Sequence, residues 1–196
     1  MKILSRFQRS VLVAITLAAL LSACDSSVAT ESSSTTSPAG APSQAGVSPT
    51  VDARPPTLAK TQGWLQIFSG TAPAGAGDVQ LTISSKPDIG QYVSDGDGRS
   101  LYRFDKDTAT PPTSTCAGPC ATTWPPLTVA RGQSVFAARV DPQLVGFIER
   151  ADGSCQITIG GWPVYYFSKD KLPGDLLGQG VGGTWFAVTP NGDKAR

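Results

Sequence analysis

The sequence predicts an all-β fold in which one unit of strands and a loop occurs twice. The segment LYRFDKD at residues 101–107 recurs as VYYFSKD at residues 164–170, and the apolar, Tyr, Phe, Lys and Asp positions keep a spacing of 63 residues. A fixed spacing with several matched positions is the signature of an internal repeat. Short segments also alternate between apolar and polar residues, as half-buried strands do, whereas no 3.6-residue period persists over a helix. We therefore expect two repeated β-meander units packed as one small sandwich-like domain.

The first residues have the features of an export signal. A basic start precedes an apolar run from Val11 to Leu21, which is too short to span a bilayer comfortably. The sequence Leu21-Ser22-Ala23-Cys24 that ends the run resembles the lipobox of bacterial lipoproteins, and this resemblance implies cleavage after residue 23 and diacylation of Cys24. The alternative is an ordinary secretory peptide cut near Ala23, which would leave Cys24 as an exposed thiol.

A lipid on Cys24 would make the membrane the first partner of this chain. The expected location is the cell envelope, on the outer face of the cytoplasmic membrane, or on its periplasmic side if the source has two membranes. Asp25 directly follows the lipidated Cys, and an Asp at that place resembles the signal that retains lipoproteins on the inner membrane of a two-membrane cell. The sequence does not say whether the source has one membrane or two, so the choice of membrane that carries the anchor stays open. Without the basic residues of the signal, 13 basic and 15 acidic residues remain, and this balance argues against a nucleic-acid partner.

Residues 24–60 are expected to form a linker that follows the signal peptide of residues 1–23. Ser, Thr, Ala, Pro and Gly dominate it, and large apolar residues are almost absent. Such a segment buries too little surface to offset its ordering entropy, so we expect a disordered tether. Residues 61–196 then suit one domain of ordinary size.

Strands are predicted in the order in which their patterns occur along this domain. They are expected over residues 63–68, 79–84, 89–94, 99–104, 144–149, 155–159 and 162–167. Asp95-Gly96-Asp97-Gly98 is a strong hairpin signal, because Gly and Asp tolerate the positive φ of tight turns. Each repeat thus has three strands and a loop that leads to a Trp, over about residues 79–130 and 144–190. The best helical candidate, residues 134–140, is short.

The repeated aromatic side chains are expected to face the core. Alternation along a strand places Tyr102 and Phe104 on one face, and the same holds for Tyr165 and Phe167. Together with Trp124 and Trp185, these large rings would supply much of the interior of a domain poor in Leu and Ile. Asp107 and Asp170 follow the two strands, where each carboxylate can accept hydrogen bonds from turn N–H groups or from a Tyr hydroxyl. We expect these acids to be structural, not catalytic.

Several motifs together resemble a known family. They are the lipobox, the doubled Tyr-x4-Asp phrase, the Cys-x3-Cys-Ala-x2-Trp-Pro-Pro segment at 116–126 and the Gly-x-Gly-Val-x-Gly-x-Trp segment at 178–185. This combination, over about residues 79–190, is similar to the tandem secreted-repeat lipoproteins with a Tyr-x4-Asp motif. The resemblance implies a bacterial envelope lipoprotein of two repeats, in a family with no established activity and no catalytic residues to carry over. Cys155 departs from the family pattern.

Three cysteines follow Cys24, namely Cys116, Cys120 and Cys155. Outside the cytoplasm pairing is the default, and the loop between Cys116 and Cys120 contains Gly and Pro, which favour a short bridge. We expect that disulfide, with Cys155 left as a buried thiol or a site of exchange. In the alternative, Cys116 or Cys120 pairs with Cys155 and ties the two halves together.

No metal and no cofactor are predicted. Copper or zinc would want two or more thiolates supplemented by His or Met, and haem would want a His or Met ligand, but the chain has no His and only Met1. The absence of His also argues against the usual Ser-His-Asp and Cys-His catalysis. The Asp95-Gly96-Asp97 turn lacks the further acids of a calcium loop. We therefore do not expect an enzyme.

The predicted function is a non-catalytic binding or structural module. Trp124, Trp162 and Tyr166 are the candidate binding surface for an envelope protein or a cell-wall glycan, because flat rings bury area at low entropic cost. Of these, Trp124 with its two following prolines is the most plausible exposed patch, and core packing is the alternative. The second hypothesis is an accessory in envelope redox chemistry, electron transfer or soft-metal handling through Cys116 and Cys120.

Overall fold

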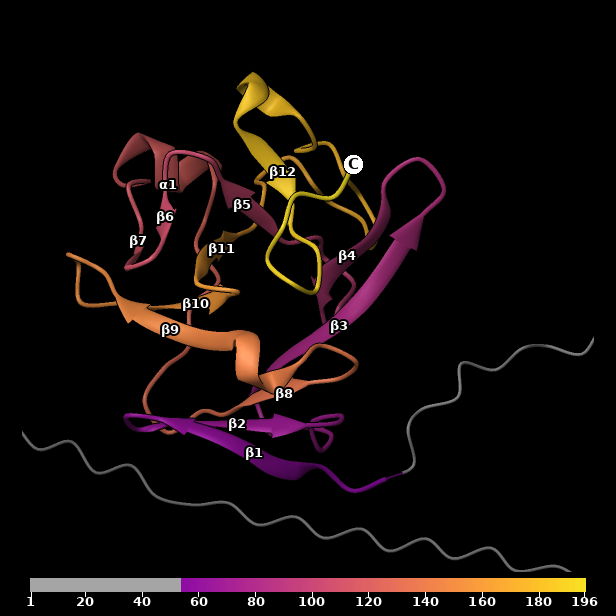
Figure 1. Ribbon diagram of the computed structural model, residues 1–196, viewed down its shortest axis with the longest axis vertical. Coiled ribbons are helices and arrows are strands. Elements are labelled where there is room, and N and C mark those ends of the chain that lie inside the picture. Colours follow the sequence, from indigo (N-terminus) through magenta and orange to yellow (C-terminus); the bar gives the residue numbers. More distant parts are fainter. Residues whose placement is uncertain (1–53) are drawn as a thin grey trace, which may run out of the picture. The chain divides into compact units, whose positions relative to one another are not determined.

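The computed structural model describes residues 54–196, which form two five-stranded sheets and very little helix (Figure 1). The all-β prediction is confirmed. The first sheet consists, in spatial order, of β1 (Thr57–Gln62), β2 (Leu65–Ser69), β8 (Val135–Ala137), β3 (Val79–Lys86) and β4 (Gly90–Asp95). The predicted signal peptide, Cys24 and most of the predicted linker lie outside the described residues.

The second sheet contains every described strand of the second repeat. Its order is β12 (Trp185–Ala187), β5 (Tyr102–Phe104), β11 (Trp162–Tyr165), β10 (Cys155–Ile159) and β9 (Val145–Glu149). The remaining elements are short: the hairpin of β6 (Thr108–Ala109) and β7 (Pro112–Thr113), and the turns α1 (Pro119–Thr123), η1 (Pro142–Leu144) and η2 (Val181–Gly183).

The two sheets do not correspond one to one to the two repeats. β4 and β5 begin as the expected hairpin, in which the Leu101 N–H donates to the Val93 carbonyl at 3.0 Å. The chain then continues into the second sheet, where β5 pairs with β11 and β12 and leaves β3 and β4 behind. The first repeat is therefore shared between both sheets, whereas β9, β10 and β11 of the second repeat stay together.

Residues 134–140 are not helical, so the helical candidate is wrong. Val135–Ala137 forms β8, which lies between β2 and β3 and is parallel to both. All three residues of this strand are buried, and pairing with two neighbours satisfies its backbone groups. Tertiary pairing thus decides the conformation of a segment whose local sequence is ambiguous.

β1 begins at Thr57 and therefore includes four residues that the composition assigned to the linker. Its side chains are mostly exposed, and backbone pairing with β2 holds it in place. The Lys60 ammonium group also donates to the carbonyls of Gln143 and Val145, at 3.0 and 2.8 Å. The predicted end of the linker was too late because it relied on low hydrophobicity, whereas backbone hydrogen bonds can hold an edge strand whose side chains are exposed.

Two apolar clusters fill the domain, and they lie on opposite faces of β11. The first is aliphatic and includes Leu101 and Val164, whereas the second is aromatic and includes Tyr102 and Tyr165. We expected one face of these strands to be in the core, yet both faces are. Short central strands with two covered faces give the domain two interiors.

Candidate functional site

The two repeats meet about a pseudo-twofold axis between β5 and β11. These strands are antiparallel, and Tyr102 lies directly opposite its repeat equivalent, Tyr165. Equivalent backbone hydrogen bonds surround this pair: Leu127 N–H donates to Val164, and Val188 N–H donates to Leu101, both at 3.0 Å. An antiparallel pair of identical positions is what a local twofold axis requires, so the duplication is also a symmetry of the fold.

The Tyr and Asp of the repeated Tyr-x4-Asp phrase, which we call the signature side chains, form hydrogen bonds across the two repeats. The Tyr102 hydroxyl donates to the Asp170 carboxylate, and the Tyr165 hydroxyl donates to the Asp107 carboxylate, both at 2.6 Å. Each Tyr therefore binds the Asp of the other repeat. The other oxygen of Asp107 accepts from the backbone N–H and hydroxyl of Thr115, at 2.7 and 2.9 Å.

Burial changes the acidity of all four signature side chains. Removal from water raises the pKa of Asp107 and Asp170 above the ordinary value, although the hydrogen bonds from Tyr165 and Tyr102 oppose this shift. Burial followed by the neighbouring carboxylate raises the pKa of both tyrosines far above their usual range. The hydroxyls thus remain protonated donors to the acids, an arrangement that stabilises structure.

Four aromatic rings continue the same symmetry as a stack. Their order is Phe104, Trp185, Trp124 and Phe167, with centroid separations of 4.1, 3.9 and 4.2 Å. The two central indoles are parallel within 1°. Tyr102 meets the edge of Trp124, and Tyr165 meets Trp185, at 5.5 and 5.2 Å. The repeat motif therefore builds the aromatic core.

Trp124 is not a surface residue, so its assignment to a binding patch is wrong. Only 4% of it is exposed, because its ring is stacked between Trp185 and Phe167. The other two residues of the predicted patch, Trp162 and Tyr166, are partly exposed. An Arg guanidinium group lies over the face of each ring. Arg103 lies 3.2 Å from the centroid of Trp162, and Arg99 lies 4.0 Å from that of Tyr166. The structure does not bring the three predicted rings together as one platform.

Tyr166 belongs to a polar cluster on the other face of β11. Its hydroxyl donates to the Asp95 carboxylate at 2.9 Å, and Arg99 pairs with the same oxygen at 2.9 Å. Burial, and then the charge of Asp95, raise the pKa of this hydroxyl far above its usual range. Asp95 therefore serves as the acceptor at the centre of the turn that the sequence identified as a hairpin signal.

Cys116 and Cys120 form the predicted disulfide. Cys116 is buried against the aromatic cluster and Cys120 is partly buried there. Cys155 is a buried free cysteine in the aliphatic cluster. Within residues 54–196, no group of three or more Cys, Asp or Glu side chains could hold a metal ion.

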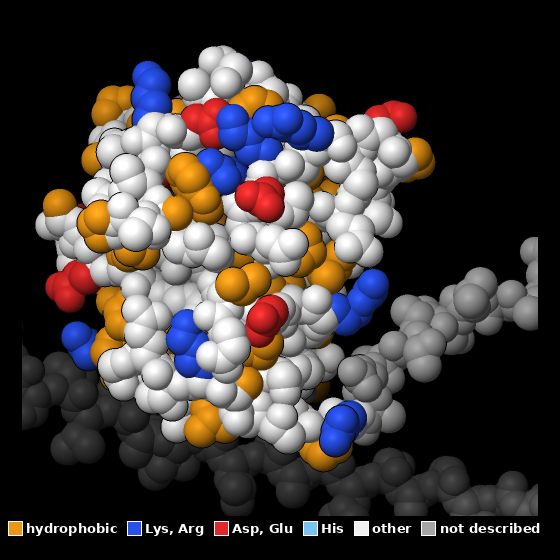
Figure 2. All heavy atoms as spheres, in the orientation of Figure 1, with side chains coloured by type: hydrophobic (Ala, Val, Ile, Leu, Met, Phe, Trp, Pro, Cys, Tyr) orange, Lys and Arg blue, Asp and Glu red, His pale blue; other side chains and the backbone are white. Residues whose placement is uncertain are grey.

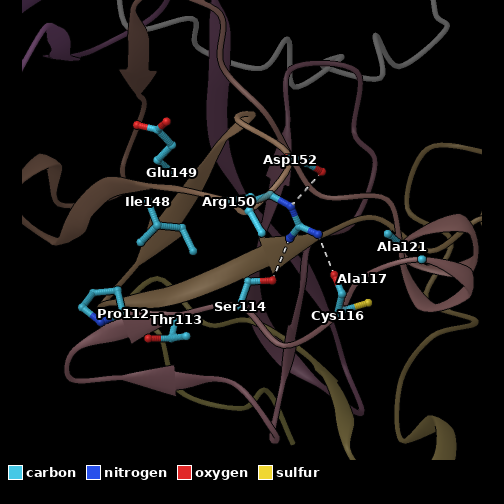
Figure 3. Close-up of a pocket in the computed structure, with 12 residues that line it drawn as sticks. Pro112, Thr113, Ser114, Cys116, Ala117, Ala121, Ile148, Glu149, Arg150 and Asp152 are labelled. Atoms are coloured by element: carbon cyan, nitrogen blue, oxygen red, sulfur yellow. Dashed lines mark hydrogen bonds and ion pairs between the residues drawn. The ribbon is translucent and has the colours of Figure 1, made fainter.

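A groove of about 690 Å³ lies beside the disulfide (Figure 3). The β6–β7 hairpin, the start of α1 and the end of β9 form its walls, and most of the side chains that line it are small. They include Pro112, Thr113, Ala117, Gly118, Ala121 and Ile148. No nucleophile with an adjacent base is among the groove residues, so its chemistry suits binding by shape and hydrogen bonding.

Arg150 fixes the base of this groove, and the sequence analysis missed it. Its guanidinium donates to the Ser114 hydroxyl at 2.7 Å, to the Gln156 amide oxygen at 2.5 Å and to the Cys116 carbonyl at 2.6 Å. Ser114 in turn lies 2.7 Å from the Tyr165 hydroxyl. A buried Arg thus connects the disulfide loop to the signature pair. Its position after a strand carried no motif, so no sequence signal pointed to it.

The fold and this site define a class of protein: an all-β chain of two repeats joined by crossed Tyr and Asp side chains. Residues 76–128 and 146–189 match the family model described as a secreted repeat of unknown function. The chain therefore belongs to this family of secreted repeats. No curated protein and no solved structure matches the chain significantly.

Proposed function

We propose that this secreted repeat protein is a lipid-anchored module of the cell envelope that binds a partner and does not catalyse a reaction. The lipobox sequence that ends in Cys24 supports the anchor. Within residues 54–196, no helix has the length and apolar character needed to cross a membrane. Anchoring through lipid would keep the repeat domain at the outer face of the cytoplasmic membrane.

The use of the signature residues inside the domain is the observation that carries this proposal. Tyr102, Asp107, Tyr165 and Asp170 are paired with one another between the repeats. A general acid or base must reach the proton that it transfers, and buried groups already engaged in hydrogen bonds lack that access. The residues that the two repeats share therefore stabilise the fold. We expect binding to involve the loops in which the repeats differ.

The groove beside the disulfide is the proposed binding surface. Arg150 and the disulfide hold its walls in place, so little ordering entropy would be lost when a ligand binds. The Thr113 and Glu149 backbones border it at strand ends. An envelope protein or a cell-wall glycan would supply the hydrogen-bonding and apolar groups that suit such walls.

Two experiments test the two parts of this proposal. Replacement of Cys24 by Ser should release the protein from the membrane fraction of intact cells, and unchanged membrane association would contradict lipid anchoring. A photo-crosslinking residue at Thr113 or Ala117 should capture one partner in intact cells, whereas the same residue at Gln66, exposed on β2, should not. Equal crosslinking from the groove positions and from Gln66, or no crosslinking from either, would contradict the groove as the binding surface.

A second candidate function is redox work through the disulfide. It is favoured by the position of Cys116 on the groove and by the partial exposure of Cys120, which would admit a thiol reagent. A measured reduction potential separates the candidates, since structural disulfides lie below about −300 mV and exchange catalysts near about −120 to −230 mV. A potential in the upper range would favour redox work over the binding module.

A further inference from the structure

The loop between β11 and β12 exposes an unusual share of the large apolar side chains. Four such side chains are exposed among residues 54–196, and three of them lie on this loop: Leu172 at 67%, Leu177 at 61% and Val181 at 37%. Single exposed apolar residues are ordinary, whereas three between Leu172 and Val181 set this loop apart from the rest of the described surface. The matching loop of the first repeat carries the disulfide instead.

Hydrogen bonds hold this loop in one shape. The Asp175 carboxylate accepts from the backbone N–H groups of Lys171 and Leu172, both at 2.8 Å. The Leu177 N–H donates to Asp170 at 3.0 Å, and the Gly174 N–H donates to the Gly98 carbonyl at 2.8 Å. The apolar side chains are therefore presented by a fixed backbone, which lowers the entropic cost of binding.

The exposed charged side chains of this loop are lysines. Lys169 and Lys171 are exposed on either side of Asp170. The two acids of the segment are only partly exposed and accept hydrogen bonds within the domain: Asp170 from Tyr102 and Leu177, and Asp175 from the loop backbone. Those backbone donors lower the pKa of Asp175, and the nearby charge of Lys86 adds to the effect.

We propose that this loop is a contact surface for an anionic lipid bilayer. Leu172, Leu177 and Val181 would enter the boundary between head groups and acyl chains, while Lys169 and Lys171 pair with lipid phosphates. Aliphatic residues beside Lys are the combination that interfacial segments use. Protein interfaces are instead depleted in Lys, and their energetic centres favour Trp, Tyr and Arg over Leu and Val. The composition therefore favours lipid over protein as the occupant.

The inference rests on the proposed anchor, which would bring the domain to a bilayer. In Figure 1, β12, which follows the loop, lies at the opposite end of the domain from β1, where the described chain begins. The residues between Cys24 and Arg54 would reach about 30 Å as a random coil and about 95 Å at full extension. That reach allows the far end of the domain to contact the membrane, and the contact would fix the orientation of the domain.

Figure 2 shows Lys and Arg side chains gathered near the top of the view, with acidic side chains next to them. Within the described residues, Lys194 forms a pair of this kind with Asp105 at 2.6 Å. Such pairs neutralise one another, whereas no ion pair within residues 54–196 involves Lys169 or Lys171. The β11–β12 loop is therefore the better candidate, because it combines unpaired Lys with exposed Leu.

Vesicle flotation of the chain from residue 25 onward tests this surface without the lipid on Cys24. This chain contains every described residue. It should bind vesicles of phosphatidylcholine and phosphatidylglycerol, and bind vesicles of pure phosphatidylcholine weakly. Leu172→Ser with Leu177→Ser should reduce binding by about tenfold or more, since each exposed Leu buries a side chain in the bilayer. Leu58→Ser, at the 53% exposed Leu of β1, is the matched control and should bind like the parent chain.

Two further measurements make the test decisive. Lys169→Gln with Lys171→Gln should weaken binding to the anionic vesicles and reduce its salt dependence. A Trp placed by Leu177→Trp should shift its emission to the blue on vesicles. Failure of the parent chain to float, or equal loss in the Leu58 control, would overturn the inference. Neither outcome would bear on the anchor, which the Cys24→Ser experiment in cells tests separately.

Discussion

The hydroxyl of Tyr102 donates to the carboxylate of Asp170, 68 residues away, at 2.6 Å. The equivalent bond joins Tyr165 to Asp107 at the same distance. A Tyr-x4-Asp motif contains both partner types within one strand and turn, yet the bonds form between motifs. Each copy therefore requires the other, and one repeat alone would leave its Tyr and Asp unsatisfied.

A double-mutant cycle distinguishes crossed pairing from pairing within one motif. Tyr102→Phe and Asp170→Asn should each destabilise the domain by about 1–3 kcal/mol, because each leaves a buried polar group without its partner. The pair should show a coupling energy of about 0.5–3 kcal/mol in urea unfolding. Tyr102→Phe combined with Asp107→Asn should be additive within about 0.5 kcal/mol. Coupling within the motif and not between motifs would contradict the structure.

Stability should fall as the pH rises through the range in which Asp107 ionises. Burial raises the pKa of Asp107 above its unfolded value of 3.8, so the folded state holds its proton more tightly. The contribution of this group is therefore complete below pH 3.8 and is lost as the pH rises through the folded pKa. Urea midpoints at several pH values should show this trend in the parent chain, and its loss in Asp107→Asn. An identical pH profile for both chains would contradict the assignment.

Reagent access should distinguish Cys155 from the disulfide. A thiol reagent should leave Cys155 unreacted in the native domain and modify it after unfolding, because Cys155 is buried in the aliphatic cluster. Cys116→Ser with Cys120→Ser should lower the free energy of unfolding by about 2 kcal/mol, the value expected for so short a closed loop. Rapid labelling of native Cys155 would place it at the surface and disprove its burial.

Gly178→Ala should disturb the aromatic core directly. An added Cβ would lie 2.8 Å from ring atoms of Tyr102 and 2.9 Å from Trp124, which is closer than packed atoms approach. Overpacking of this kind costs about 1–3 kcal/mol. Near-ultraviolet circular dichroism should change together with the urea midpoint, since the Trp124 ring must shift. An unchanged spectrum and midpoint would show that this backbone does not press on the rings.

The local pattern was sufficient for most strands of the repeats, though not for β12, and for the short disulfide. Alternation from Val79 to Ile83 and the turn at Asp95 placed β3 and β4, because a strand with one buried face leaves its period in the sequence. The nearby Cys116 and Cys120 needed no long-range information to pair. β8 and β1 were missed or misplaced because their partners, not their own composition, make them strands.

The candidate site was much less accessible to sequence reasoning. Trp124 and its following prolines suggested a surface patch, yet stacking with Trp185 buries the indole. Arg150 follows a strand without any motif, and only the fold brings Ser114, Gln156 and the Cys116 carbonyl around its guanidinium. Such residues are defined by contacts between distant segments, which no local spacing reports.

The sequence by itself determined that one unit occurs twice, that the unit is made of strands, and that Tyr, Phe, Trp and Asp recur at equivalent places. Only the tertiary structure decided that each Tyr binds the other repeat's Asp, and that Trp124 and Trp185 stack on the axis between them. The physical reason is that periodicity and turn chemistry act over a few residues, whereas a hydrogen bond or a ring contact depends on which strands become neighbours. That choice is made by the burial of both faces of β5 and β11.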